Sequence, residues 1–180
     1  MGIKSKTANE KLRETILSYL KTHNAMTLAT TQDNVPWAAA VFYANDGFTL
    51  YYLSDPDTRH SMNIAEDSII CSTIYEDYDD YREIKGIQME AKAEPVTAED
   101  ELAKAVKVYI EKYPDVSAYL KLMMTPFPKV VNLLEKALVK LPGTPDFTTP
   151  FPARFYKVIP SKIHWIDNEK SFGKRQELIL

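Results

Sequence analysis

The feature that most constrains the fold is a tight-turn signal between two runs that both have the composition of β-strands. Asn45-Asp46-Gly47 separates residues 36–43 from residues 48–54, and both runs contain aromatic or branched side chains and no charge. Glycine accepts a positive φ at low steric cost, so this sequence favours a short hairpin turn. Strands joined in this way run antiparallel, and the chain is therefore expected to build an antiparallel sheet.

Other stretches with strand composition extend this sheet. They occupy residues 25–31, 68–75, 84–96, 154–159 and 162–167, with Pro160 and Ser161 joining the last two. In residues 84–96 the apolar alternation slips by one position at Gly86, which predicts a β-bulge there. Six or seven short strands in sequence-adjacent pairs are typical of a small closed or partly closed barrel.

Helical spacing appears at three places between the strands. Helices are predicted over residues 8–22, 58–66 and 98–113, with Thr58 and Thr97 as N-caps and Pro114 ending the third. Residues 115–141 carry more helical spacing, whereas residues 142–152 hold four prolines and predict a loop. We expect one mainly β, α+β domain over residues 1–180, a split β-barrel with a helical insertion at about 115–153. No element is assigned to residues 168–180.

Composition limits the possible functions. A net charge of -3 and a pI of about 5.7 argue against a nucleic-acid-binding surface. No apolar run is long enough to span a bilayer, and the N-terminus lacks the apolar core of a signal peptide. The single cysteine, Cys71, excludes an internal disulfide and lies in an apolar strand, which predicts a buried, unreactive thiol. The expectation is a cytoplasmic protein without membrane or nucleic-acid partners.

Motifs for several common chemistries are missing. The five glycines are widely separated, which excludes a Walker loop and a G-x-G-x-x-G fingerprint, so a phosphate would have to be held by side chains and a helix start. The three histidines are too dispersed for a metal motif, and the acidic run at residues 76–81 lacks the order of a calcium loop. That run is predicted to be a solvated hairpin tip. No sequence pattern supports hydrolysis.

Residues 51–63 are the best candidate for a binding site. An aromatic strand runs into a polar turn, and the turn leads directly to Thr58, Arg59 and His60 at the predicted helix start. Free backbone N–H groups, the helix dipole and a guanidinium favour a phosphate at such a position. The alternative is that Arg59 is an exposed first-turn residue paired with Asp55 or Asp57, and that His60 faces solvent.

With these pieces in order, the chain resembles the pyridoxamine-5′-phosphate oxidase-like FMN-binding split-barrel family, and within it a bacterial branch distinct from the vitamin-B6 oxidase itself. The resemblance covers roughly residues 8–113 and 154–180. The segments that carry it are residues 26–30, 36–43, 50–54, 58–63, 85–89, 166–168 and 172–175.

The resemblance implies a homodimer with FMN at the subunit interface and a small-molecule substrate. The residues that it implies for FMN binding are Phe42, Tyr43, Tyr52, Ser54, Thr58, Arg59, His60, Asn63, Gln88, Lys174 and Arg175. The segment from Thr58 to His60 corresponds to the family's phosphate-binding segment, with His60 where lysine is usual. Gln88 matches a glutamine that reaches the flavin ring, and Lys174 with Arg175 matches a basic pair that can approach from the partner subunit.

The chain also departs from the vitamin-B6 oxidases. Residues 37–43 contain none of the basic residues with which those enzymes contact the FMN phosphate, and their C-terminal substrate-binding pattern is missing. Oxidation of pyridoxamine phosphate is therefore not expected. The preferred function is an FMN-dependent oxidoreductase acting on an unknown small molecule, for which no catalytic residue is named because the flavin carries the chemistry.

Two alternatives remain open from the sequence. One is a flavin-binding sensor or carrier without turnover. The other is a split barrel that holds heme or a deazaflavin, and heme would favour a free histidine such as His60 or His164. The tryptophans, Trp37 and Trp165, are predicted to be core residues more readily than cofactor contacts, although Trp37 and Tyr43 could form a substrate wall.

Overall fold

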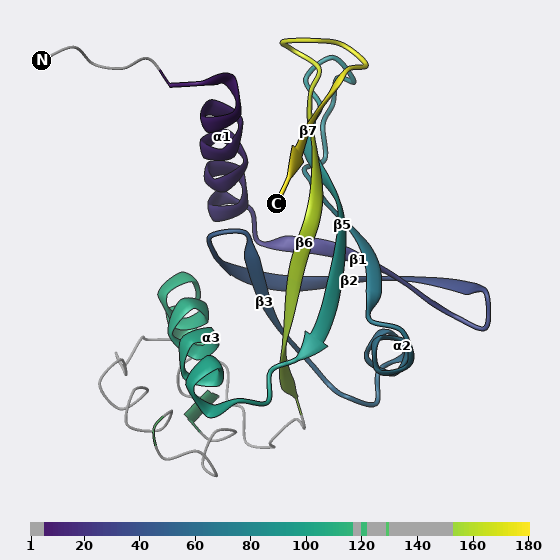
Figure 1. The fold of residues 1–180 in the computed structure, drawn as a ribbon, viewed down its shortest axis with the longest axis vertical. Coiled ribbons are helices and arrows are strands. Elements are labelled where there is room, and N and C mark those ends of the chain that lie inside the picture. Colours follow the sequence, from purple (N-terminus) through teal and green to yellow (C-terminus); the bar gives the residue numbers. More distant parts are fainter. Residues whose placement is uncertain (1–5, 117–119, 122–128, 130–152) are drawn as a thin grey trace, which may run out of the picture.

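The computed structural model describes residues 6–116, 120–121, 129 and 153–180 (Figure 1). Most of the predicted insertion at about 115–153 lies outside these residues. The described elements, in chain order, are α1 (Ala8–Thr22), β1 (Ala25–Gln32), β2 (Val35–Asp46), β3 (Thr49–Ser54), α2 (Arg59–Glu66), β4 (Ile69–Tyr75), β5 (Lys85–Pro95), α3 (Glu99–Lys112), the 3₁₀ turn η1 (Pro114–Val116), β6 (Arg154–Asp167) and β7 (Arg175–Ile179).

The strands form one antiparallel sheet that closes on itself through β6. The strand order is β3-β2-β1-β4-β5-β6-β7, with an additional pairing between β3 and β6. One edge of β6 pairs with β5, while its other edge pairs first with β3 and then with β7. The barrel is thus closed along the first part of β6 and open along the second. The predicted α+β split barrel is confirmed.

Residues 154–167 form one strand, where the sequence predicted two. The register between β5 and β6 shifts at Glu90 and Ala91, which pair with Lys162 and Pro160, so Ser161 is the extra residue of a β-bulge. The bulge keeps apolar side chains pointing inward, because Val158 is buried before it and Ile163 after it. A bulge lets the strand continue at the position where the sequence indicated a break.

The bulge predicted at Gly86 is wrong. Gly86 pairs in register with Tyr75 on β4 and with Ile166 on β6. A Cβ at this position would lie 3.0 Å from the backbone oxygen of Ile74 and 3.3 Å from the Cβ of Tyr75. Glycine is therefore needed for the close approach of two strands, and it interrupts the apolar alternation without interrupting the hydrogen-bonded ladder.

Two hydrophobic clusters hold the helices against the barrel. The first fills the barrel and includes Ile16 and Leu20 of α1, so that α1 packs beside it. The second lies between α3 and the outer side of β2, β3 and β6, around Tyr51 and Phe155. Trp165 is buried in the first cluster, as predicted. No helix in the described segments is long and apolar enough to cross a membrane.

Helix starts were predicted less well than helices. At α1, Thr7 and Glu10 form a complete capping box. At α3, Ala98 occupies the cap position and no side chain caps the helix, so the prediction that Thr97 is the N-cap is wrong. Three acidic residues in the first turn of α3, Glu99, Asp100 and Glu101, favour its positive end instead.

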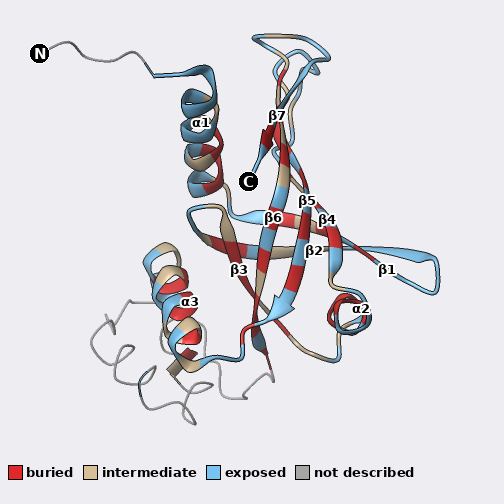
Figure 2. Cartoon of the chain, viewed as in Figure 1, coloured by how far each residue is buried: buried red, intermediate tan, exposed pale blue. Residues whose placement is uncertain are grey.

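The outer face of β2, β1 and β4 is largely exposed (Figure 2), and most of its side chains are apolar. Directly paired residues share a face, so one row contains Ala38, Ala29 and Cys71 and the next contains Ala40, Thr27 and Thr73. Cys71 is exposed, and the prediction of a buried thiol is wrong. The inward positions of β4 are taken by Ile70, Ser72 and Ile74. The apolar run around Cys71 contains both inward and outward positions, so the sequence did not show which way Cys71 faces.

The hairpin of β1 and β2 projects beyond the rest of the barrel (Figure 1). At its tip Asp33 and Asn34 both have positive φ, of 52° and 60°, as hairpin turns of two residues require. Trp37 near the tip is 40% exposed, so it is not the core residue that the sequence favoured. Apolar side chains are therefore exposed to solvent on both faces of this hairpin.

Candidate functional site

The candidate site forms where β3 ends and α2 begins. Ser54, the last residue of β3, is buried and pairs with Arg154 across the barrel seam. The chain then turns sharply, because the Asp57 N–H donates to Asp55 Oδ1 at 2.8 Å and the Thr58 N–H donates to the Asp55 carbonyl at 3.2 Å. This turn brings the first residues of α2 back against Ser54.

Thr58 occupies the predicted N-cap position, but its side chain does not cap the helix. Its hydroxyl donates to the Asp55 carbonyl at 2.8 Å and lies 2.9 Å from Ser61 Oγ. The N–H groups in the first turn of an uncapped helix have no partner within the helix. A ligand with acceptor oxygens could therefore bind them, and the helix dipole favours an anion there.

Three hydroxyl groups and one imidazole form a connected cluster at this junction. His60 Nε2 lies 2.7 Å from Ser54 Oγ and 3.2 Å from Thr58 Oγ1. Ser61 Oγ lies 3.3 Å from Ser54 Oγ and so completes the cluster. His60 is only 8% exposed, and burial lowers the pKa of its imidazole. The ring is therefore neutral at pH 7 and turned inward, contrary to the solvent-facing alternative.

Two buried polar atoms near this cluster have no hydrogen-bond partner within the described residues, namely the Tyr52 hydroxyl and Asn63 Oδ1. The Tyr52 ring lies 6.5 Å from the His60 ring, centroid to centroid. The Asn63 amide donates to Thr30 Oγ1 at 2.9 Å and so ties α2 to β1. Buried polar groups are usually paired, so these atoms mark the junction as a place with unused bonding capacity.

Arg59 makes no ion pair among the residues that the structure describes, so the predicted alternative of a bond to Asp55 or Asp57 is not observed. Its guanidinium lies over the Trp37 ring, 4.5 Å from the ring centroid. Stacking on an aromatic face leaves the planar N–H donors directed sideways and able to bind an anion. Arg59 is exposed, so its charge is accessible from solvent.

The chemistry of this junction fits the phosphate of a flavin nucleotide. Arg59 would supply the positive charge, Ser54 and Thr58 would supply hydroxyl groups, and the start of α2 would supply N–H groups. The fit rests on the uncapped helix start and on an arginine that no carboxylate neutralises within the described part of the chain.

The other predicted residues lie elsewhere. Gln88 is exposed on β5, in a row that continues through Thr73 on β4 and His164 on β6. Phe42 is 60% exposed on β2. Tyr43 is fully buried, and its hydroxyl donates to the Leu20 carbonyl at 2.9 Å. A substrate wall built from the Tyr43 side chain is therefore excluded.

Lys174 and Arg175 lie far from α2 within one protomer. Arg175 pairs with Ile166, which pairs with Gly86 at the start of β5. The strand that follows α2 begins instead near the other end of β5, opposite Lys92. Six residues of strand separate Gly86 from Lys92, or about 20 Å. The predicted phosphate site and the predicted basic pair thus lie near opposite ends of β5.

Two residues of this site, Ser61 and Thr30, were not predicted, and Trp37 was predicted as a core residue or part of a substrate wall and not as a contact of Arg59. Ser61 follows Thr58 by three positions, so a helical spacing could have placed the two hydroxyls on one side of α2. Thr30 and Trp37 come from the β1–β2 hairpin, and each contacts α2 through tertiary packing. No local pattern in the sequence predicts contacts of this kind.

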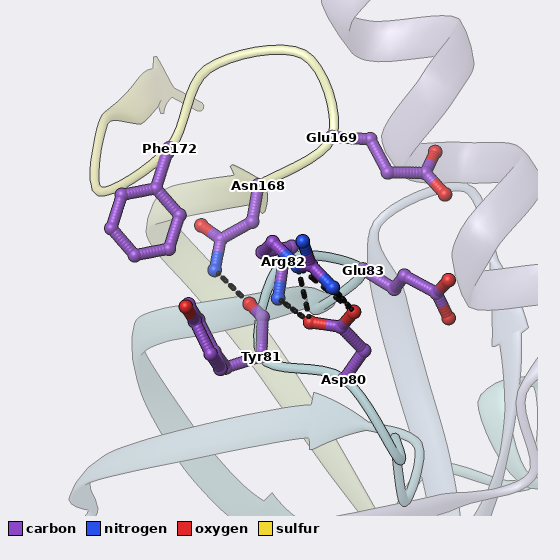
Figure 3. A pocket seen from close by; sticks show the side chains of 7 residues that line it. All are labelled: Asp80, Tyr81, Arg82, Glu83, Asn168, Glu169 and Phe172. Carbon is purple, nitrogen blue, oxygen red and sulfur yellow. Dashed lines mark hydrogen bonds and ion pairs between the residues drawn. The ribbon is translucent and has the colours of Figure 1, made fainter.

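Away from this junction, a cleft of about 660 Å³ opens between the β4–β5 and β6–β7 loops (Figure 3). The Tyr81 and Phe172 rings meet edge to face there, with centroids 5.8 Å apart. The Asn168 amide donates to the Tyr81 carbonyl at 2.7 Å, and Arg82 is bound by Asp80. The predicted solvated hairpin tip forms one wall of this cleft. No cluster of potential metal ligands occurs among the described residues.

The fold and this junction define a split-barrel protein with a candidate phosphate-binding helix start. A family model described as pyridoxamine 5′-phosphate oxidase matches residues 12–135, which is more than half of the chain. The chain belongs to this family. The family match is consistent with a split barrel and does not by itself assign the oxidase reaction.

Similar proteins were also found individually. A UPF0306 protein of Haemophilus ducreyi is 28% identical over 108 residues, which cover 58% of this chain and 74% of that protein. A heme binding protein of Mycobacterium smegmatis has a similar structure, with a TM-score of 0.65 and 18% identity over 98% of this chain. This chain spans 60% of that protein. The heme storage protein HutZ of Vibrio cholerae has a TM-score of 0.54 at 12% identity, covering 92% of each chain.

Proposed function

We propose that this protein is a homodimeric FMN-binding protein that works as an FMN-dependent oxidoreductase on a small molecule. The observation that carries the proposal is the junction of β3 and α2. There an uncapped helix start, the Ser54 and Thr58 hydroxyls and an arginine without a carboxylate partner in the described segments occur together. Membership of the pyridoxamine 5′-phosphate oxidase family supports the same assignment.

In this proposal Arg59 is the main determinant of phosphate affinity. A guanidinium forms two parallel hydrogen bonds with phosphate oxygens, and charge-assisted hydrogen bonds contribute about 1.5–3 kcal/mol. Trp37 holds the guanidinium in place by stacking beneath it. The turn that begins at Asp55 fixes the position of Thr58 at the start of α2.

The flavin, once bound, supplies the transfer of hydride or electrons. The chain supplies a surface for its ring and a hydrogen-bonding side chain, Gln88. The row that contains Gln88 continues across the sheet through the small residues Thr73, Thr27 and Ala40. A flat ring system can lie against such a surface without a clash.

The proposed dimer explains why the predicted site residues are divided between two ends of the barrel. Lys174 and Arg175 are too far from α2 to act on the same cofactor within one protomer, whereas a second copy can bring its own pair to the first copy's site. The exposed apolar face of β2, β1 and β4 suits a contact between two copies. It includes Phe42, Ile69 and Tyr75, which are 60%, 57% and 63% exposed.

The proposal is tested by titrating the purified protein with FMN and following the quenching of flavin fluorescence. We expect Arg59→Ala to weaken FMN binding by about tenfold or more, since each 1.4 kcal/mol is a tenfold change in affinity. Arg13→Ala is the matched control, because Arg13 also stacks on an aromatic ring, Phe48, but lies on α1. Wild-type protein that binds no FMN, or equal affinities for wild type and Arg59→Ala, would contradict the assignment.

Turnover is tested separately by adding NADPH to the FMN-loaded protein without oxygen. Rapid bleaching of the flavin absorbance supports an oxidoreductase, and persistent absorbance supports a flavin sensor or carrier.

Heme is the second ligand to test, because His164 lies beside Gln88 on the exposed face and two structural relatives are described as heme proteins. A Soret band that disappears in His164→Ala and persists in Arg59→Ala would favour heme over FMN.

A further inference from the structure

We propose that His60 is a positioning residue that takes up a proton when a phosphate binds at the start of α2, so that the site gains affinity as the pH falls. This inference rests on the proposed function, because it concerns the phosphate of the same ligand. It adds a regulatory property to the site, namely that the cationic contribution of His60 appears only on binding.

The geometry makes His60 an indirect contact of the ligand. Its Nε2 atom bonds with Ser54 Oγ at 2.7 Å and with Thr58 Oγ1 at 3.2 Å, and the ring is 8% exposed. Thr58 is the residue at the uncapped start of α2, so the two hydroxyls connect the imidazole to that end of the helix. A phosphate at that helix start would contact the hydroxyls first and would act on the ring through them.

No carboxylate contacts His60 in the part of the chain that the structure describes. The titratable and charged groups around it come from four elements, namely Tyr52 on β3, Arg154 and Tyr156 on β6, Asp55 and Asp57 in the turn, and Arg59 on α2. Asp55 is occupied by the Asp57 N–H. Burial is the cause that lowers the pKa of His60, and no charged neighbour opposes it. In the free protein the ring is neutral.

Binding of a phosphate ester reverses this balance. The hydroxyls of Ser54 and Thr58 can turn their hydrogens toward the phosphate, and their oxygens then accept from the Nε2–H of His60. A dianion close to a buried ring favours the imidazolium form, since an opposite charge within a few ångströms favours ionisation. One proton moves from solvent to the imidazole, and no covalent bond of the protein or ligand changes.

Two substitutions separate this role from a merely structural one. His60→Gln keeps a side chain that can donate and accept hydrogen bonds but cannot titrate. His60→Lys introduces a side chain whose pKa in an unfolded chain is about 10.4, so it holds its charge to higher pH than an imidazole does. If the proposal holds, the first variant loses the protein's own pH dependence, and the second keeps its affinity for FMN to higher pH than the wild type does.

The experiment measures FMN affinity by calorimetry from pH 6 to pH 8.5, in buffers of different ionisation enthalpy, for wild type and both variants. The phosphate of FMN titrates near pH 6 by itself, so the comparison uses the ratio of His60→Gln to wild-type Kd at each pH. We expect that ratio to be about three- to tenfold larger at pH 6.5 than at pH 8.5, since one pKa unit corresponds to a tenfold change. We also expect proton uptake that the glutamine variant abolishes.

An NMR titration of the His60 ring, with and without FMN, gives the direct readout. A pKa that rises on FMN binding supports the proposal. FMN binding with an unshifted His60 and equal proton uptake in wild type and His60→Gln would overturn it while leaving the proposed function intact. Failure of the wild-type protein to bind FMN at any pH would instead overturn the proposed function and this inference together.

Discussion

Lys112 illustrates how a single half-buried cation can join three parts of the fold. Its ammonium donates to the Leu20 and His23 carbonyls at the end of α1 and lies 4.2 Å from the centroid of the Tyr43 ring. A cation near the C-terminus of a helix is favoured by the exposed carbonyls and the dipole. Burial nevertheless lowers the pKa of Lys112 to about 8, because no carboxylate among the described residues compensates for the lost hydration.

This lowered pKa predicts a pH dependence of stability. Lysine has a pKa of about 10.4 in an unfolded chain, so between pH 8 and pH 10 the unfolded state binds more protons than the folded state. The free energy of unfolding should therefore rise with pH in this window. Urea denaturation of wild type and Lys112→Met at several pH values measures the effect.

The wild-type protein should gain stability relative to Lys112→Met between pH 8 and pH 10. Lys107→Met is the control, because Lys107 is exposed on the same helix. The tyrosines with raised pKa values, including Tyr43 and Tyr113, stay protonated in this range. A constant difference between wild type and Lys112→Met across the range would show that Lys112 remains charged in the folded state.

At the scale of elements, Gly86 permits a close approach of β4 and β5. We expect Gly86→Ala to lower the free energy of unfolding by about 1–3 kcal/mol, because the added methyl group would press on the Ile74 carbonyl and strain from overpacking is of this size. Thermal unfolding measures the loss. Lys92→Ala, at an exposed position of the same strand, should change stability by less than about 0.5 kcal/mol.

An unchanged melting temperature for Gly86→Ala would mean that the two strands can separate slightly without cost. Gly86 also shows why the prediction of a bulge from the sequence was wrong. A slip in apolar alternation at a glycine predicts a bulge, but the observed reason is a lack of space beside Tyr75. The bulge that does occur, at Ser161, follows a proline that the sequence suggested as a break between two strands.

Strand and helix positions were nevertheless largely predictable, because they depend on local composition. Ala8–Thr22 matches the predicted helix 8–22, and the pairing of β2 with β3 follows from the turn at Gly47. The strand at Arg175–Ile179 was not predicted. It exists because the second half of β6 leaves an edge free, and no local pattern in residues 168–180 contains that information.

At the scale of the whole molecule, the segment Thr58–His60 was predicted as a site, and its position at a helix start is confirmed. What the sequence did not contain was the direction of each side chain. His60 turns inward to Ser54, whereas Arg59 turns outward onto Trp37. The direction of Arg59 depends on the β1–β2 hairpin, which contacts α2 through Trp37 and Thr30. The roles of all these residues at a flavin stay predictions.

The proposed dimer makes a prediction at the same scale. Phe42→Glu places a charge in the exposed apolar face and should convert the dimer into monomers, because burying an unpaired carboxylate is costly. Sedimentation measures the mass. Lys107→Glu is the control, since it changes the charge on the exposed side of α3.

Cys71 gives a second readout of the same contact. Its thiol lies on the apolar face and is exposed in one protomer, so a dimer through this face should protect it from thiol reagents. The wild-type protein should react slowly and Phe42→Glu rapidly. A monomeric wild-type protein whose Cys71 reacts at once would rule out this face as the contact.

Ser161, the extra residue in β6, determines which side chains of this strand face the interior of the barrel. Before Ser161 the even-numbered side chains Tyr156, Val158 and Pro160 point inward, and after it the odd-numbered Ile163 and Trp165 do. Ser161 therefore acts as a phase correction. If Ser161 were paired as a regular strand residue and did not bulge, every later position of the strand would face the opposite way, and the interior would receive His164 in place of Trp165. One inserted residue thus allows a continuous strand to serve both the closed and the open half of the barrel.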